Sequence, residues 1–226
     1  MANEYVEGPR FSDVVKGEAQ NPERYSREAV TVLGGSGAAR ELKLGAVVGK
    51  IETDTTTTVA ADGGNTGDGT ITGITLGSKA QLGDYVLTCV EAAANGGVFE
   101  VLAPDGDRLS DGVVDSAEVG DHLNFTINDG AADFVVGDKF TITVAGGSGK
   151  IVAINFAALD GSQNAYGLMI ANVTAPDGVD MPGVAIVRQA TIAPSKLVWP
   201  DAATTEQKAA ALAQLAAKGI IAREEV

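Results

Sequence analysis

The chain has 226 residues, of which 45% are apolar and 29 are glycine, and its formal net charge is −14. This length suits one large or two small domains, and the many glycines between short apolar runs favour a mainly β protein. The acidic balance argues against nucleic acid and anionic membranes as partners. A single cysteine, Cys89, excludes an internal disulfide, and its apolar surroundings in the sequence predict a buried thiol.

Residues 1–27 are polar, and their apolar side chains are too few to offset the entropy of ordering the segment. We therefore expect a flexible N-terminal arm. Two interpretations remain open: an arm that orders on a partner, for example by adding a strand to a sheet edge, and a tail without a role. The candidate contact residues of such an arm are Tyr5, Val6, Arg10, Phe11, Val14 and Val15.

Neither a signal peptide nor a membrane span is expected. The first ten residues lack the apolar core of a signal sequence. The longest apolar run, residues 151–159, is far too short to cross a bilayer. We expect a soluble protein made in a cytoplasm.

Alternating apolar and β-branched residues predict strands at residues 27–33 and 42–51, joined by a glycine-rich turn. Residues 53–69 are then threonine-, glycine- and aspartate-rich and read as a linker, and a second glycine-rich stretch follows at residues 146–149. Glycine-rich linkers on both sides indicate an inserted domain at residues 54–147.

The predicted insert contains several strand-like runs separated by turn sequences of the Asn-Gly and Asp-Gly kind. This spacing predicts a small antiparallel β-sandwich or barrel with an immunoglobulin-like architecture. The cysteine–tryptophan–cysteine core of true immunoglobulin domains is absent, so the prediction concerns architecture only. The predicted strands are residues 70–76, 84–91, 98–103, 107–114, 121–128 and 139–144.

After the insert, strands are expected at residues 150–158, 165–171 and 184–192, and a C-terminal helix follows. Thr204 and Gln207 have the spacing of a capping box at its start. Gly219 stands where a left-handed residue would end the helix.

The sequence contains no convincing catalytic or metal-binding motif. The single histidine, His122, cannot supply a metal cluster and has no nucleophile placed beside it by a known motif. The acidic run from Asp105 fails as a calcium loop, because Leu109, Ser110 and Ser116 occupy positions five, six and twelve. We expect no enzyme, no metal and no cofactor.

The C-terminal stretch Leu197-Val198-Trp199-Pro200, followed by an alanine-rich helix ending in Lys218-Gly219-Ile220, resembles the lambda-like bacteriophage head decoration proteins. Further similarity follows in the family's order at residues 25–32, 42–51, 165–170 and 184–188. The resemblance implies a compact β-rich domain from residues 28–53 and 148–226 that carries the insert. Its family-like structural residues are Trp199, Pro200, Leu212, Leu215 and Gly219.

The same resemblance implies a structural virion protein that binds the major capsid protein on the capsid exterior, after synthesis in the host bacterial cytoplasm. It implies homotrimers at three-fold positions of the expanded capsid, which stabilise the shell against internal DNA pressure. We expect the insert on the outward face, since an addition facing the shell would obstruct binding. An alternative is a tail or fibre accessory protein whose insert binds host-surface glycans. A secreted hydrolase fragment is a third, and the missing catalytic groups argue against it.

Overall fold

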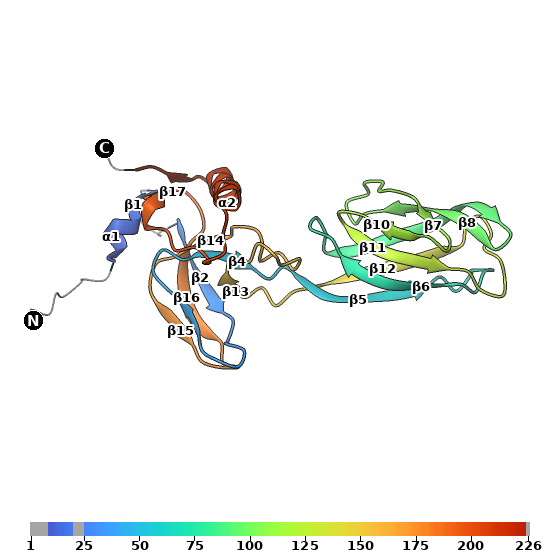
Figure 1. The fold of residues 1–226 in the computed structure, drawn as a ribbon, viewed down its shortest axis with the longest axis horizontal. Coiled ribbons are helices and arrows are strands. Elements are labelled where there is room, and N and C mark those ends of the chain that lie inside the picture. Colours follow the sequence, from blue (N-terminus) through green and yellow to red (C-terminus); the bar gives the residue numbers. More distant parts are fainter. Residues whose placement is uncertain (1–8, 20–24, 225–226) are drawn as a thin grey trace, which may run out of the picture. The chain divides into compact units, whose positions relative to one another are not determined.

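The computed structural model describes residues 9–19 and 25–224 (Figure 1). The chain forms two compact units. Met1–Ile51 together with Gly149–Val226 make the first, which we call the barrel unit, and Glu52–Ser148 make the second, the two-sheet unit. Strands dominate both units, and a helix lies near the C-terminus, which confirms the predicted mainly β fold with a C-terminal helix.

Five strands of the barrel unit close into a barrel in the order β13-β2-β16-β14-β4. Neighbouring strands are antiparallel except β13 and β2, which are parallel. Val47 and Val48 are both buried, although successive strand residues point to opposite faces. Burial on both faces explains the continuous apolar runs in the strands of the barrel unit. The strands are β2 (Arg27–Val32), β4 (Val47–Lys50), β13 (Ile151–Ala153), β14 (Gly167–Met169) and β16 (Met181–Ile186).

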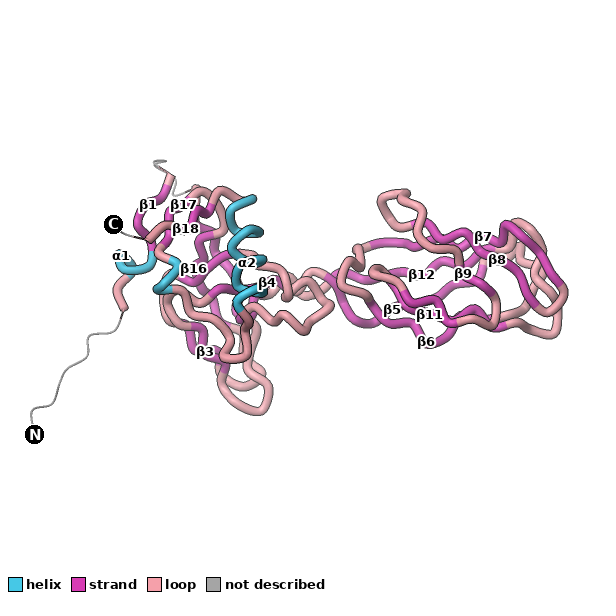
Figure 2. The backbone as a smooth tube through the Cα atoms, turned by 45° about the horizontal axis from the view of Figure 1, so that its top comes forward, coloured by secondary structure: helices cyan, strands magenta, loops and turns pink. Residues whose placement is uncertain are grey.

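A smaller sheet in the same unit joins the two ends of the chain (Figure 2). Its middle strand β17 (Ala190–Ile192) pairs antiparallel with β1 (Val15–Glu18) and parallel with β18 (Ile220–Ala222). We call it the terminal sheet. The remaining elements of the unit are α1 (Phe11–Val14), β3 (Arg40–Leu42), β15 (Val173–Ala175), η1 (Pro194–Lys196) and α2 (Thr205–Ala217).

The expectation of a flexible arm through residue 27 is wrong for residues 11–18, which form α1 and β1. Val14 is completely buried and Val15 is 5% exposed, so the few apolar side chains of this segment lie in the core. Pairing with β17 satisfies the backbone of β1. The prediction from composition counted the apolar side chains of the segment. The position of those side chains in the fold, rather than their number, decides how much apolar surface is buried.

In the two-sheet unit, neighbouring strands of both sheets pair antiparallel, in the orders β5-β12-β7-β8-β9 and β10-β11-β6. One apolar cluster takes side chains from both sheets, including Phe99, Phe140 and Phe125, and includes Cys89, whose predicted burial is confirmed. The strands are β5 (Thr53–Ala61), β6 (Thr70–Leu76), β7 (Gly83–Ala93), β8 (Gly96–Leu102), β9 (Gly112–Val113), β10 (Ala117–Val119), β11 (Leu123–Asn128) and β12 (Lys139–Gly146).

Two predictions for this unit are wrong. Residues 53–58, expected as a linker, belong to the nine-residue strand β5, since β-branched threonines suit a strand and β12 supplies its partner. Residues 107–114, expected as a strand, contain only the two-residue β9. There the Asp107 N–H donates to Asp105 Oδ1 at 3.0 Å, which closes a turn in place of a ladder.

Four predicted strands of the barrel unit are shorter than expected. Of residues 165–171, only Gly167–Met169 form a strand. The run at residues 42–51 is interrupted at Gly45, whose φ of +82° no strand residue adopts. The run at 184–192 is likewise interrupted at Gln189, with a φ of +45°, so that it splits into the end of β16 and all of β17. Of residues 150–158, only Ile151–Ala153 form a strand.

Candidate functional site

The chain ends, which carry most of the predicted site residues, meet in one apolar cluster of the barrel unit. Val14 and Val15 from the N-terminal segment belong to the same cluster as Leu215 of α2 and Ile220 of β18. Phe11, Trp199 and Leu212 pack against it while partly exposed. The structure thus brings together the two groups of residues that the sequence had placed at opposite ends of the chain.

Within the N-terminal segment, the predicted contact residues differ in what they offer a partner. Arg10 is exposed before α1, and its backbone N–H donates to Asp13 Oδ2 at 2.8 Å. Phe11 is half-buried, whereas Val14 and Val15 are core residues without an exposed face. A contact with another protein through Val14 or Val15 therefore does not fit this conformation. Tyr5 and Val6 lie outside the described residues.

The capping residues of α2 have the predicted geometry. Thr204 N–H donates to Gln207 Oε1 at 2.9 Å, and Gln207 N–H donates to Thr204 Oγ1 at 3.3 Å, which completes the capping box. Gly219 has a φ of +76° just beyond the helix end, as predicted. Leu215 is completely buried. The two caps fix where the helix begins and ends.

Trp199 and Pro200 line a shallow cleft of about 260 Å³ in the barrel unit. Leu42 and Val47 contribute to its apolar wall, and the neighbouring Val198 is 39% exposed. Within the tetrad that carries the family resemblance, Leu197 is therefore buried in the core, whereas Val198 is accessible to solvent.

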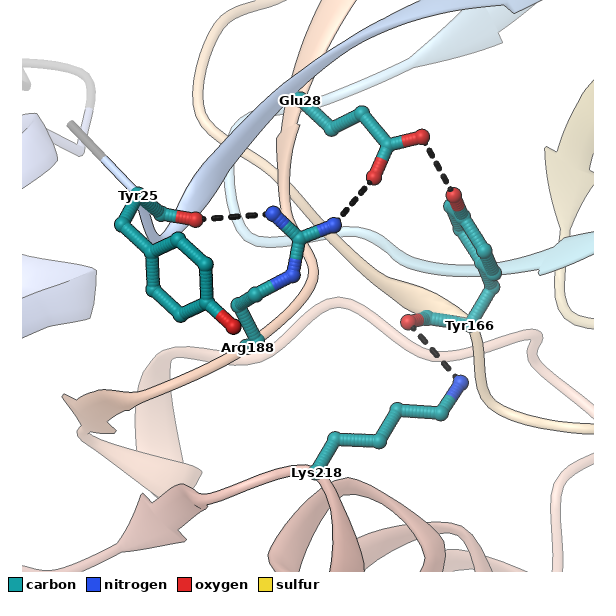
Figure 3. A network of polar contacts seen from close by, with 5 residues as sticks. All are labelled: Tyr25, Glu28, Tyr166, Arg188 and Lys218. Atoms are coloured by element: carbon teal, nitrogen blue, oxygen red, sulfur yellow. Dashed lines mark hydrogen bonds and ion pairs between the residues drawn. The ribbon is translucent and has the colours of Figure 1, made fainter. Parts of the chain in front are cut away.

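A polar network that sequence reasoning missed lies beside β2 (Figure 3). Arg188 Nη2 donates to Glu28 Oε2 at 2.6 Å, and Nη1 donates to the Tyr25 carbonyl at 2.8 Å. Tyr166 Oη donates to Glu28 Oε1 at 3.0 Å, while Lys218 Nζ donates to the Tyr166 carbonyl at 3.2 Å. Because directly bonded residues of this network stand up to 163 positions apart, as Tyr25 and Arg188 do, no local pattern could have found it.

Charge is divided very unequally between the two units. The two-sheet unit holds 3 of the 16 basic residues, Lys79, Arg108 and Lys139, and 16 of the 30 acidic ones, a net charge of −13. The barrel unit carries the remaining 13 basic and 14 acidic residues, a net charge of −1. Nearly all of the chain's charge of −14 therefore belongs to one unit.

Across the described part of the chain, no group of three or more His, Cys, Asp or Glu side chains is arranged to hold a metal ion. His122 Nδ1 lies 3.3 Å from Tyr85 Oη. Burial raises the pKa of the Cys89 thiol, and the Asp138 charge adds to this, so the thiol is a poor nucleophile. Within residues 9–19 and 25–224, none of the helices combines the length and apolar character of a bilayer span.

The fold and these contacts define a mainly β protein of two units with a structural polar network. A family model described as Bacteriophage lambda head decoration protein D matches residues 4–220. The chain therefore belongs to this family, as the sequence resemblance predicted. The family is structural rather than catalytic, and its role places the protein on the phage capsid.

No curated protein matches the chain. Two crystal structures of Xanthomonas campestris FlgL, in space groups H3 and C2, share 20% and 21% sequence identity with it over 45% of its length, each with a TM-score of 0.31. The aligned part spans only 33% and 32% of those chains, about a third of their length. At this TM-score the likeness supports no conclusion about fold or function.

Proposed function

We propose that this protein binds the major capsid protein on the outside of the expanded capsid, as homotrimers at three-fold positions. Membership of the head decoration family over residues 4–220 is the observation that carries this proposal. A ligand that binds only the expanded lattice stabilises that lattice by its binding free energy, and so opposes the outward pressure of packaged DNA. Repetition over a symmetric shell multiplies a modest contact.

The barrel unit is the part that we propose to contact the shell. A trimer of this chain carries 3 × −14 = −42 charges, so a contact face drawn evenly from its surface would be strongly acidic. The barrel unit, with a net charge of −1, would scarcely repel an acidic partner, whereas the two-sheet unit, with a net charge of −13, would repel it strongly.

We further propose that the two-sheet unit is an inserted β-sandwich module that faces outward. The barrel unit closes without it, since Gly149 N–H donates to the Ile51 carbonyl at 2.9 Å and Ile51 N–H donates to the Lys150 carbonyl at 3.0 Å. The two chain positions that flank the module are thus already paired with each other inside the barrel unit.

In the barrel unit, the accessible residues nearest the N-terminal segment are our candidate contact surface. Arg10 and Phe11 are at least partly exposed there, and Tyr25 is 47% exposed beneath the guanidinium of Arg188, 5.0 Å from its ring centroid. With Tyr5 and Val6, they form a proposed arm whose aromatic and cationic groups suit a protein interface. The buried Val14 and Val15 are excluded from it and instead anchor its base.

Sedimentation with expanded, undecorated capsids of the same phage tests this proposal. The variants are the full chain, a chain lacking residues 1–9, which retains α1 and β1, and the full chain with Phe11→Ala. We expect the full chain to pellet in multiples of three per three-fold site and the truncated chain to bind more weakly. Equal binding of all three chains would reduce the arm to a tail, and absence of binding by the full chain would refute decoration.

The truncation must stop before α1 because deletion of residues 1–19 would also remove Val14 and Val15 from the core. Loss of binding by that longer deletion would report unfolding of the barrel unit as well as loss of contact. Circular dichroism of the shorter truncation serves as the folding control.

A tail or fibre accessory role is disfavoured by the family match, which spans both units. The idea that the two-sheet unit has a ligand of its own stands separately and depends on the chemistry of that unit.

A further inference from the structure

A cleft of about 430 Å³ opens in the two-sheet unit, beside β10 and β11 and the loop that follows β8. Its volume is within the range of roughly 300–1,000 Å³ typical of small-molecule sites. Val101 and Phe125 form its buried floor, Leu109 and the 79% exposed Val119 contribute accessible apolar surface, and polar side chains of Glu118 and His122 line it as well. An apolar surface combined with several hydrogen-bonding groups is the composition expected of a binding site.

The turn that carries the polar groups is held firmly by the segment before β7. Gly77 N–H donates to the His122 carbonyl at 2.8 Å, and Lys79 N–H donates to the Asp121 carbonyl, also at 2.8 Å. A Cβ on Gly77 would come within 2.2 Å of the Asp121 carbonyl oxygen, so this approach requires glycine. Groups fixed in this way lose little conformational entropy when a ligand binds.

The Tyr85 hydroxyl holds one ring nitrogen of His122. Tyr85 Oη accepts a hydrogen bond from the Gln81 N–H at 2.7 Å and lies 3.3 Å from His122 Nδ1. The other ring nitrogen, Nε2, can form a hydrogen bond with a ligand, as donor or as acceptor according to the tautomer.

The charges around the cleft select against an anionic ligand. Lys79 Nζ lies 2.8 Å from Asp121 Oδ2, and Arg108 Nη2 lies 2.9 Å from Asp111 Oδ1, so both cations of the cleft already have acidic partners. The net charge of −13 on the unit repels anions. Carboxylates that are already paired still have free lone pairs that accept hydrogen bonds from hydroxyl groups.

We propose that this cleft binds a neutral saccharide. The hydroxyls of a sugar match the mixed donors and acceptors of Glu118, Asp121 and His122, and the C–H face of its ring matches the apolar surface of Leu109 and Val119. This site concerns the two-sheet unit and does not depend on capsid binding.

The test uses the intact, isotope-labelled protein, titrated by NMR with a panel of neutral mono- and disaccharides at millimolar concentration, together with a glycan array. We expect saturable shifts of the amides of Ser110, Val119 and His122. Glu118→Gln and His122→Ala should each weaken binding about tenfold, the loss of one hydrogen bond of about 1.4 kcal/mol. Glu91→Gln, an exposed strand glutamate that does not line the cleft, is the matched control and should bind as the wild type does.

Three outcomes overturn the proposal: no saturable shifts and no array signal for any neutral glycan, binding of acidic glycans alone, or unchanged binding in both cleft variants. The spectra of the variants show whether they are folded. Capsid sedimentation of the same variants should equal that of the wild type, so a failure of decoration is distinguishable from a failure of the cleft.

Discussion

Arg27 of β2 holds Glu18 of β1 through a fork of close contacts. The Nε atom donates to both carboxylate oxygens, at 2.9 and 3.0 Å, and Nη2 lies 2.9 Å from Oε1. The same guanidinium lies 5.0 Å from the ring centroid of Phe11. One side chain of the barrel thus binds both the helix and the strand of the N-terminal segment, which explains how a polar segment remains in place.

Glu18→Gln should lower the free energy of unfolding of the barrel unit by about 1 kcal/mol, because a charge-assisted fork becomes a neutral hydrogen bond. Both side chains are partly buried, with 25% of Arg27 and 18% of Glu18 exposed, so solvent screens the pair only in part. Trp199, the single tryptophan of the chain, lies in the barrel unit and reports its denaturant unfolding by fluorescence. Glu41→Gln, at the exposed middle position of β3, is the control. Identical unfolding midpoints for the two variants would contradict a stabilising role of the Arg27–Glu18 pair.

Leu215→Ala should cost 2–5 kcal/mol, because the side chain is completely buried between α2 and the terminal sheet and its loss leaves a cavity. Leu212→Ala on the same helix should cost less, since that side chain is partly exposed. Thr204→Ala should cost about 1 kcal/mol through loss of the cap. Tryptophan fluorescence again gives the three values, and a cost of Leu212→Ala equal to that of Leu215→Ala would be inconsistent with this packing.

The C-terminal helix could be predicted from the sequence because both of its ends are encoded locally. Thr204, Gln207 and Gly219 lie within a few residues of the groups that they cap, so no tertiary information was needed. The first strand of the barrel, β2, was predicted on similar grounds from its alternating residues.

The remaining errors concern features that only tertiary contacts decide. The threonines of β5 became a strand because β12 was available to pair with them, and Val14 became a core residue because Leu215 and Ile220 lay nearby. The Glu28–Arg188 pair joins residues 160 positions apart, and a single sequence carries no signal for such a contact.

The surroundings of Asp138 lead to a prediction about how the stability of the two-sheet unit depends on pH. Its carboxylate accepts backbone hydrogen bonds from Thr66 and Gly67 at 2.9 Å and from Val135 at 3.1 Å, while the residue is only 3% exposed. Burial alone raises the pKa of the Asp138 carboxyl, but the three amides outweigh burial and lower it. Asp138→Asn turns one acceptor oxygen into a donor that faces N–H groups, so we expect a loss of about 2 kcal/mol at neutral pH.

The sign of the pH dependence follows from that lowered pKa. The carboxylate stabilises the fold fully above the unfolded pKa of about 3.9, and the contribution is lost as the pH falls through the lower folded value. The difference between wild type and Asp138→Asn should therefore narrow below about pH 4. Calorimetry and hydrogen exchange at Thr66 and Gly67 measure this stability difference, because Trp199 does not report unfolding of the two-sheet unit. A stability difference that does not change with pH would exclude stabilisation by the ionised Asp138 carboxylate.

Deletion of residues 52–148, with Ile51 and Gly149 joined through an Asn-Gly turn, should leave a folded barrel unit. Lys50 and Ile151 are paired across β4 and β13, and Ile51 N–H donates to the Lys150 carbonyl, so a three-residue loop of Asn, Gly and Gly149 closes the gap. The net charge should fall from −14 to −1, and the deleted chain should still bind expanded capsids. Its Trp199 unfolding transition should match that of the full chain, since every residue of the barrel clusters remains. A folded deletion variant that no longer sediments with capsids would show that the two-sheet unit contributes the shell contact, and would reverse the assignment of inner and outer units.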